Sequence, residues 1–423
     1  MIKKLLVLTM TFVSCVMTFA TDMVVKQKNG ETLRFDVKNV EEVIFEESIP
    51  KETAIVDTSE TPLKFKILSD STVEVINDDS YRDALIDTIP IPSKVRIDGK
   101  VYDVTSIGNY AFVRCRSLTN INIPESVTSI GYGTFYHCSG LTSINIPKSV
   151  TSIGQSAVAY CSGLTSINIS SSIKNIADST FAECRSLTSI KIPESVTSIE
   201  ESAFSSCSNL ASINIPEGVT NIGENAFSWC GLTSINIPNG ITSIESSTFA
   251  GCRSLTSINI PDSVTYIGYS AFAYCNSLTS INIPEGVKNI GAGAFDGCSS
   301  LEPRLLVYDN GTKCYGWIGS EKECTSVVIP DGVKEIGDYA FYKIFYGLTS
   351  VTFPESLESI GEMAFAGCEE LTTAELSSNL KTLGYGAFMY CKKLDRIINA
   401  SEADVNVGKN AISDCKSVTW LKE

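Results

Sequence analysis

Cysteine has the greatest capacity for chemistry in this sequence, because fifteen cysteines occur among its 423 residues. Many recur singly at a spacing of 23 residues, as at Cys115, Cys138, Cys161, Cys184, Cys207 and Cys230. No two form the Cys-x-x-Cys pair typical of redox and zinc sites. Equivalent residues of stacked coils also lie in a poor geometry for disulfides. We therefore interpret the repeated cysteines as small, buried apolar side chains.

Other catalytic groups are scarce. The chain has one histidine, His137, which argues against Ser-His or Cys-His catalysis and against histidine metal sites. Adjacent carboxylates such as Glu200 and Glu201 lack an apolar enclosure that would make them an acid and base pair. The formal net charge of −15 argues against nucleic acid or an anionic membrane as partner. We expect no enzyme activity, no metal and no cofactor.

The cysteines belong to a repeat, of which residues 127–147, VTSIGYGTFYHCSGLTSINIP, form one unit. Ile121 and Ile123 alternate with Asn122, which predicts a strand with one buried face. Phe112 and Cys115 lie three residues apart, which fits one helical turn with both side chains pointing inward. One such coil cannot bury its apolar face alone, whereas stacked coils share a continuous core. The repeat therefore predicts a solenoid.

The submotifs Leu-x-x-Ile-x-Ile-Pro and Ile-Gly-x-x-Ala-Phe-x-x-Cys resemble the BspA-like leucine-rich repeats of bacterial surface proteins, over residues 104 to about 421. The resemblance implies a right-handed α+β solenoid with a parallel, concave β-sheet, short helical or 3-10 turns and a small β-rich N-terminal cap. It also implies an exported protein that adheres to host matrix proteins, host cells or other bacteria, without catalysis.

Composition and pattern divide the chain into seven segments. We expect a signal peptide at 1–20, a short β segment at 21–47, a linker at 48–62, a β-rich cap at 63–103, nine coils at 104–301, a β-hairpin insert at 302–325 and four coils at 326–423. Residues 1–20 combine an early Lys pair with a short apolar run and a small residue at the cleavage site, as secretory signals do. Cys15 is a possible lipidation site, which leaves a second interpretation of this segment open.

Three groups of residues are candidates for a site. One strand position in successive coils carries an amide row, broken once by lysine: Asn122, Asn145, Asn168, Lys191, Asn214, Asn236, Asn259 and Asn282. Its side chains point out of the sheet, where they can bond to one another, bind a partner, or do both. Tyr308, Tyr315 and Trp317 gather on the insert, either for binding or to cover apolar edges. Cys314 and Cys324 are either a disulfide or buried thiols.

Two functions fit these features. The first is an exported, non-enzymatic binding protein that recognises a protein or glycan of the host matrix or of other cells through the faces of the solenoid. It would act as a monomer at the outer surface of a bacterium or outside the cell, anchored by lipid if Cys15 is modified. The alternative is a passive structural component of the cell envelope, because near-identical coils also arise without selection for a ligand.

Overall fold

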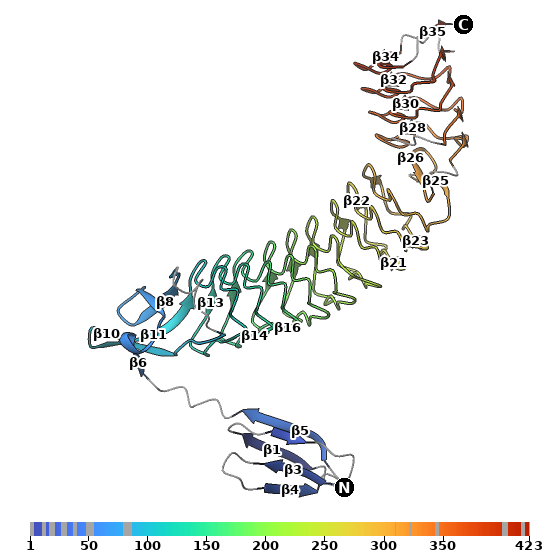
Figure 1. Ribbon diagram of the computed structural model, residues 1–423. Helices are drawn as coiled ribbons and strands as arrows, with labels where there is room; N and C mark the ends of the chain where they lie inside the picture. The colour runs from blue at the N-terminus through green and yellow to red at the C-terminus, as the bar shows by residue number, and fades with distance from the viewer. Residues whose placement is uncertain are drawn as a thin grey trace.

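The structure is a computed structural model. It describes residues 55–422 except 79–86, 309, 321–323, 343–346, 400–404 and 416–418. At 398–399 and 419–422 it describes the backbone alone. Before residue 55 it describes only the backbone of five strands. Figure 1 shows a long stack of coils that runs from the cap around β8 to the C-terminal strand β35 and bends near β25 and β26. The repeat therefore forms a solenoid, as the sequence predicts.

Two rows of short parallel strands run along the stack. The first row has a strand in the Thr-Ser-Ile-Asn segment, or in its equivalent, of most coils: β12 (Asn120–Asn122), β14 (Ser143–Asn145), β16 (Ser166–Asn168), β21 (Ser257–Asn259), β23 (Ser280–Asn282), β27 (Ser326–Val328), β29 (Ser350–Thr352), β31 (Thr373–Leu376), β33 (Arg396–Asn399) and β35 (Thr419–Lys422). Isolated bridges between Lys191 and Asn214, and between Asn236 and Asn259, continue it.

The second row follows the proline turn of each coil. It comprises β13 (Ser129–Ile130), β15 (Ser152–Ile153), β17 (Asn175–Ile176), β18 (Ser198–Ile199), β19 (Asn221–Ile222), β20 (Ser243–Ile244), β22 (Tyr266–Ile267), β24 (Asn289–Ile290), β28 (Glu335–Ile336), β30 (Ser359–Ile360), β32 (Thr382–Leu383) and β34 (Asn406–Val407). Equivalent residues pair in register, for example Ile130 with Ile153. In-register pairing places identical side chains on top of one another along the stack.

The turns that the sequence predicts as helical are not helices. Among the described residues the structure holds one short 3-10 helix, η1 (Thr58–Glu60), in the cap and no α-helix. In the first turn the amides of Ala111 and Val113 bond three residues back within the coil, whereas the amides of Tyr110, Phe112 and Arg114 bond carbonyls of the next coil. A helix would keep all these bonds within one segment.

Left-handed backbone conformations stop a helix from forming in these turns. Tyr110 has a φ of 56° and Arg114 a φ of 63°, and most coils repeat the pair with residues other than glycine. Such residues cost backbone energy that the surrounding structure must offset. The offset here is the set of hydrogen bonds to the next coil, so the turn conformation depends on stacking. The helical part of the predicted α+β class is therefore wrong, and the solenoid is built of strands and turns.

Phenylalanine and cysteine form the centre of the stack. The rings of Phe181, Phe204 and Phe227 are fully buried and lie parallel, with centroids 5.2 and 5.5 Å apart. Each neighbouring cysteine donates its thiol to the carbonyl oxygen of the phenylalanine position in the preceding coil, as from Cys207 Sγ to Phe181 O at 3.2 Å. Cysteine thus supplies both a small apolar body and a weak donor that satisfies a buried carbonyl.

The N-terminal cap covers the open end of the first coil. β6 (Ile55–Asp57), β7 (Lys64–Ile67), β8 (Thr72–Ile76), β10 (Lys94–Ile97) and β11 (Lys100–Ile107) form one sheet that continues into β13 and β15. β9 (Thr88–Pro90) pairs with β12 and so begins the first strand row. Because β6 and η1 belong to this part of the fold, the cap begins before residue 63, inside the segment expected to be a linker.

Five strands precede the cap. β1 (Lys4–Met10) pairs in parallel with β5 (Val40–Glu47). β2 (Ser14–Val16), β3 (Asp22–Lys26) and β4 (Thr32–Asp36) form an antiparallel sheet. β1 and β2 lie within residues 1–20, where the sequence predicts a secretory signal. Removal of that signal, and the use of Cys15, whose side chain lies outside the described residues, stay predictions.

The insert joins two hydrophobic cores. β25 (Arg304–Tyr308) and β26 (Lys313–Ile318) form an antiparallel hairpin, and β26 continues in parallel into β28. Leu306 and Ile318 belong to the core of the preceding coils, whereas Cys314 belongs to the core of the coils that follow. Alternate residues of the hairpin therefore face different cores, so the two parts of the array are coupled through it.

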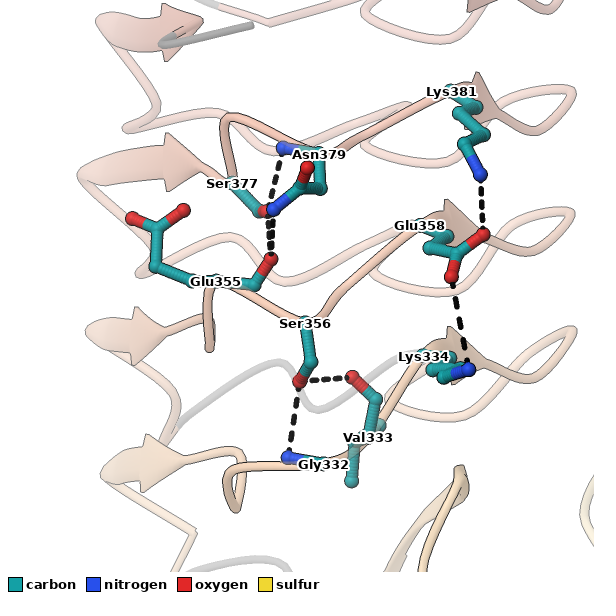
Figure 2. Close-up of polar contacts among 9 residues, drawn as sticks. All are labelled: Gly332, Val333, Lys334, Glu355, Ser356, Glu358, Ser377, Asn379 and Lys381. Carbon is teal, nitrogen blue, oxygen red and sulfur yellow. Dashed lines mark hydrogen bonds and ion pairs between the residues drawn. The ribbon is translucent and has the colours of Figure 1, made fainter.

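Charged side chains link the coils after the insert. Glu358 bonds Lys381 of the next coil at 2.6 Å and faces Lys334 of the preceding coil at 4.0 Å, as Figure 2 shows. Ser356 Oγ, on the same strand-to-strand turn, donates to Val333 O and accepts from Gly332 N. The hydrogen bond and charge of Lys381 lower the pKa of Glu358. Exposed ion pairs of this kind add little stability, so the stack depends on its core and on backbone pairing rather than on them.

We predict that replacing one stacked ring weakens the array far more than replacing a surface residue. Phe204→Ala should lower the free energy of unfolding by about 3–5 kcal/mol, because it leaves a cavity between two rings. Asn209→Ala, an exposed residue of the same coil, should change it by less than about 0.5 kcal/mol. Urea unfolding followed by circular dichroism measures both. Equal stability of the two variants would contradict the shared core.

Candidate functional site

The amide row lies on the surface of the first strand row. Asn145, Asn168, Asn259 and Asn282 are exposed, and the isoleucines on either side of each are buried. Lys191 is exposed in the same row and bridges Asn214 through the backbone. The remaining members, Asn122, Asn214 and Asn236, are exposed as well. The alternation predicted from the sequence is therefore present, and the row forms a continuous polar surface.

Threonines, rather than the amides, link the coils next to this row. Thr142 Oγ1 donates to Thr119 O at 3.2 Å, and Thr165 Oγ1 donates to Thr142 O at 3.1 Å. The same bond recurs one coil at a time along much of the array. Within the described amide row, one side-chain bond joins two members, from Asn168 Nδ2 to Asn145 Oδ1 at 3.1 Å. The amides are thus largely available to a partner.

The first strand row lies on the outer side of the bend. In Figure 1, β14, β16, β21 and β23 run along the outer side, whereas β13 and β22 lie nearer the inner side. The concave placement of the sheet and of the amide row that we expected from the sequence is therefore wrong. The bend itself lies at the hairpin insert, where the strand-and-turn repeat is interrupted, and the repeat alone does not encode its direction.

The aromatic residues of the insert pack against the two cores. Tyr308 and Tyr315 contact the core of the preceding coils, and Trp317 contacts the core of the following coils. Tyr315 Oη donates to Lys288 O at 2.5 Å, and Trp317 Nε1 donates to Ser320 O at 3.2 Å. This placement favours the interpretation that they cover apolar edges. A binding function for these residues stays a prediction.

The described cysteines are almost all buried side chains. Cys314 and Cys324 are both fully buried, and a disulfide between them stays a prediction. Burial raises the pKa of Cys314 to about 11 and that of Cys161 to about 12. Cys415 differs, because it is half-buried and a hydrogen bond with Cys391 lowers its pKa. The described residues contain no group of three or more His, Cys, Asp or Glu side chains able to hold a metal.

A cluster of tyrosines on the turns was missed by the sequence analysis. Tyr110, Tyr132, Tyr136 and Tyr160 lie together on the turns of successive coils and line a hollow of about 470 Å³. We call them the tyrosine cluster. They occupy positions that vary from coil to coil, whereas the repeat pattern in the sequence is defined by the positions that stay constant. His137, which the sequence indicates is a surface residue, stacks on Tyr160 with centroids 4.5 Å apart.

Comparison with known proteins identifies the family. The model of the BspA type leucine rich repeat region matches in six copies, over residues 74–208, 174–302 and 319–422. The chain belongs to this family. BspA-type repeats thus account for the array on both sides of the insert. No match was found among curated proteins.

Solved structures of similar leucine-rich repeat proteins include two from bacteria. A leucine-rich repeat protein from Bacteroides ovatus is 27% identical, with a TM-score of 0.46, and the match covers 74% of this chain and 92% of that one. A leucine rich cell surface protein from Faecalibacterium prausnitzii is 26% identical, with a TM-score of 0.48, and the match covers 85% and 92%. In the part of this BspA-type chain that the structure describes, no helix is long and apolar enough to span a membrane.

We predict that thiol reactivity separates Cys415 from the buried cysteines. With a lowered pKa and partial exposure, Cys415 should be alkylated first by iodoacetamide at pH 8. Cys161 and Cys252, whose pKa values burial raises to about 12, should react only after denaturation, because the thiolate is the nucleophile. Peptide mapping by mass spectrometry at timed intervals measures the order. Rapid labelling of Cys161 in the native chain would contradict the buried thiol array.

Proposed function

We propose that this protein is an exported, non-enzymatic binding protein that recognises a macromolecule of the host matrix or of other cells through the faces of its solenoid. The observation that carries the proposal is the exposed amide row, repeated over coils whose strand isoleucines are buried and whose threonines bond to the neighbouring coil. Amides both donate and accept hydrogen bonds. A row of them suits a protein or glycan partner that makes many weak polar contacts along the stack.

Family membership supports the location that this function needs. BspA-type repeats are typical of bacterial surface proteins, and the similar Faecalibacterium protein is a cell surface protein. The apolar segment within residues 1–20 would direct export. Cys15 would then either leave with the signal peptide or carry a lipid anchor. We further propose that the exported chain acts as a monomer.

A second function fits one observation. The strand segments of several coils are nearly identical, for example residues 141–147 and 232–238, LTSINIP in both. Duplication of a coil produces such near-identical segments, and they persist when no ligand imposes selection for differences between coils. The alternative is therefore a structural component of the cell envelope, without a specific ligand.

Binding to extracellular matrix and to whole cells distinguishes the two functions. The chain without residues 1–20 should bind immobilised host matrix or cells of neighbouring bacteria. An in-register deletion of residues 197–264 removes three coils and joins Val196 to Thr265, which recreates the Val-Thr pair of a normal coil. Binding through a distributed surface should weaken by a few-fold in this variant rather than vanish. Surface plasmon resonance gives the apparent affinities.

A quadruple alanine variant tests the amide row directly. Replacing Asn145, Asn168, Asn259 and Asn282 together by alanine should weaken binding while the melting temperature stays close to that of the parent, because these amides are exposed. No binding by the parent chain to matrix or cells would favour the structural alternative. Unchanged binding by the quadruple variant would exclude the amide row as the surface used.

A further inference from the structure

The turn face is the variable surface of the array. We define it as the loops between each second-row strand and the following cysteine, such as residues 131–138. The second residue after the second-row strand and the residue before the Cys differ between coils, as Tyr132, Gln155 and Asp178 do at the first of these positions. Binding at one defined place on the array requires surface residues that differ between coils, whereas a uniform row can only bind along its whole length. The tyrosine cluster lies on this face.

The rings of the cluster are held in fixed positions by one another and by a glycine. Tyr110 and Tyr132 meet edge to face with centroids 5.0 Å apart, and Tyr136 and Tyr160 meet at 5.2 Å. Tyr110 lies over Gly133, where a Cβ atom would stand 2.7 Å from the Tyr110 ring. Gly133 has a φ of 55°, a conformation that glycine adopts without strain. A serine occupies the equivalent position in the next coil, at Ser156.

The hollow beside these rings is long rather than deep. It begins at the tyrosine cluster and continues along the stack past Ser179, Glu183 and Ser205. A second hollow of about 290 Å³ adjoins it toward the cap, and Tyr110 and Tyr136 line both. The groove therefore follows the solenoid axis over several coils. Volumes of this size fit ligands of a few hundred Å³, and the elongated shape fits a linear chain.

The groups that line the groove are polar but carry little net charge. His137, which stacks on Tyr160 of the groove lining, has a pKa that burial and the nearby Arg114 lower, so that its ring is neutral near pH 7. Burial raises the pKa of Tyr136, and a hydrogen bond with Tyr132 raises that of Tyr110, so both phenols keep their protons. The carboxylate of Glu183 is paired with Arg185 at 2.7 Å. The groove thus offers aromatic faces and hydroxyl groups.

We propose that this groove binds a linear, neutral oligosaccharide chain. A sugar ring presents C–H groups on its face and hydroxyls around its edge, which match tyrosine faces flanked by serine and phenol hydroxyls. A peptide fits less well, because the turn amides of His137 and Tyr160 are already bonded to carbonyls of the next coil and cannot pair with a peptide backbone. A cation fits less well, because Arg114 lies beside the same rings.

The inference rests on the proposed binding function but assigns it to the turn face and to one class of ligand. The probes are cellohexaose, chitohexaose, maltohexaose and mannohexaose, titrated into the full chain by isothermal calorimetry. At least one should bind. Tyr132→Ala combined with Tyr160→Ala should weaken that binding by about tenfold or more, because aromatic contacts of this kind dominate interfaces. Gly133→Ser should weaken it too, because the added side chain displaces Tyr110.

Two control variants match these substitutions elsewhere on the turn face. Tyr385 and Tyr390 occupy the coil positions of Tyr132 and Tyr160 and are 41% and 49% exposed. Their double alanine variant should bind the oligosaccharide like the parent. Gly386→Ser should also bind normally, because a Cβ there meets its nearest neighbour at 3.4 Å. Melting followed by circular dichroism checks that all four variants fold.

The outcomes separate this inference from the proposed function. Binding of a hexasaccharide that the cluster variants weaken and the control variants leave intact supports the groove. If the parent adheres to matrix or cells but binds none of the four probes, the inference is overturned and the proposed function stands. Equal affinity in the cluster and control variants, or binding of a hexapeptide panel at the cluster in place of the sugars, also overturns it. If the parent binds nothing in either assay, both fail.

Discussion

The whole structure depends on one constraint, which is that a coil cannot bury its own apolar side chains. The Phe204 ring, for example, is covered by the Phe181 ring of the coil before it and by the Phe227 ring of the coil after it. The backbone amides of the turns also depend on stacking, because every second one donates a hydrogen bond to a carbonyl of the next coil. Core and hydrogen bonds are therefore both shared between neighbours, and stability accumulates along the stack.

This constraint leaves only the outer surfaces free to vary. Before the insert the first strand row repeats nearly the same polar sequence from coil to coil, and its threonines link the coils through backbone carbonyls. The turn face tolerates many residue types, because its conformation is held by backbone bonds to the next coil rather than by its side chains. Two surfaces of different character follow, one uniform and hydrogen-bonding, the other varied and locally aromatic.

Much of the fold could be predicted from the sequence, because a 23-residue period and the alternation of Ile121, Asn122 and Ile123 leave little choice of architecture. The helical turn was wrong, since the three-residue spacing of Phe112 and Cys115 fits a helix and a chain of tight turns equally well. The tyrosine cluster could not be found by spacing alone. Tyr110 and Tyr160 are 50 residues apart in sequence and meet only because coils stack. A comparison of the variable positions between coils would have pointed to it.

Amide hydrogen exchange of the intact chain, followed by mass spectrometry, tests the shared core most directly. If the coils protect one another, the turn amides of the central coils should exchange slowest, with protection that declines toward the cap and the C-terminal coil. The turn amides of Phe204 and Ser206, which bond only to the next coil, should be as protected as those that bond within their own coil. Fast exchange of these inter-coil amides, with slow exchange of their neighbours, would contradict the account.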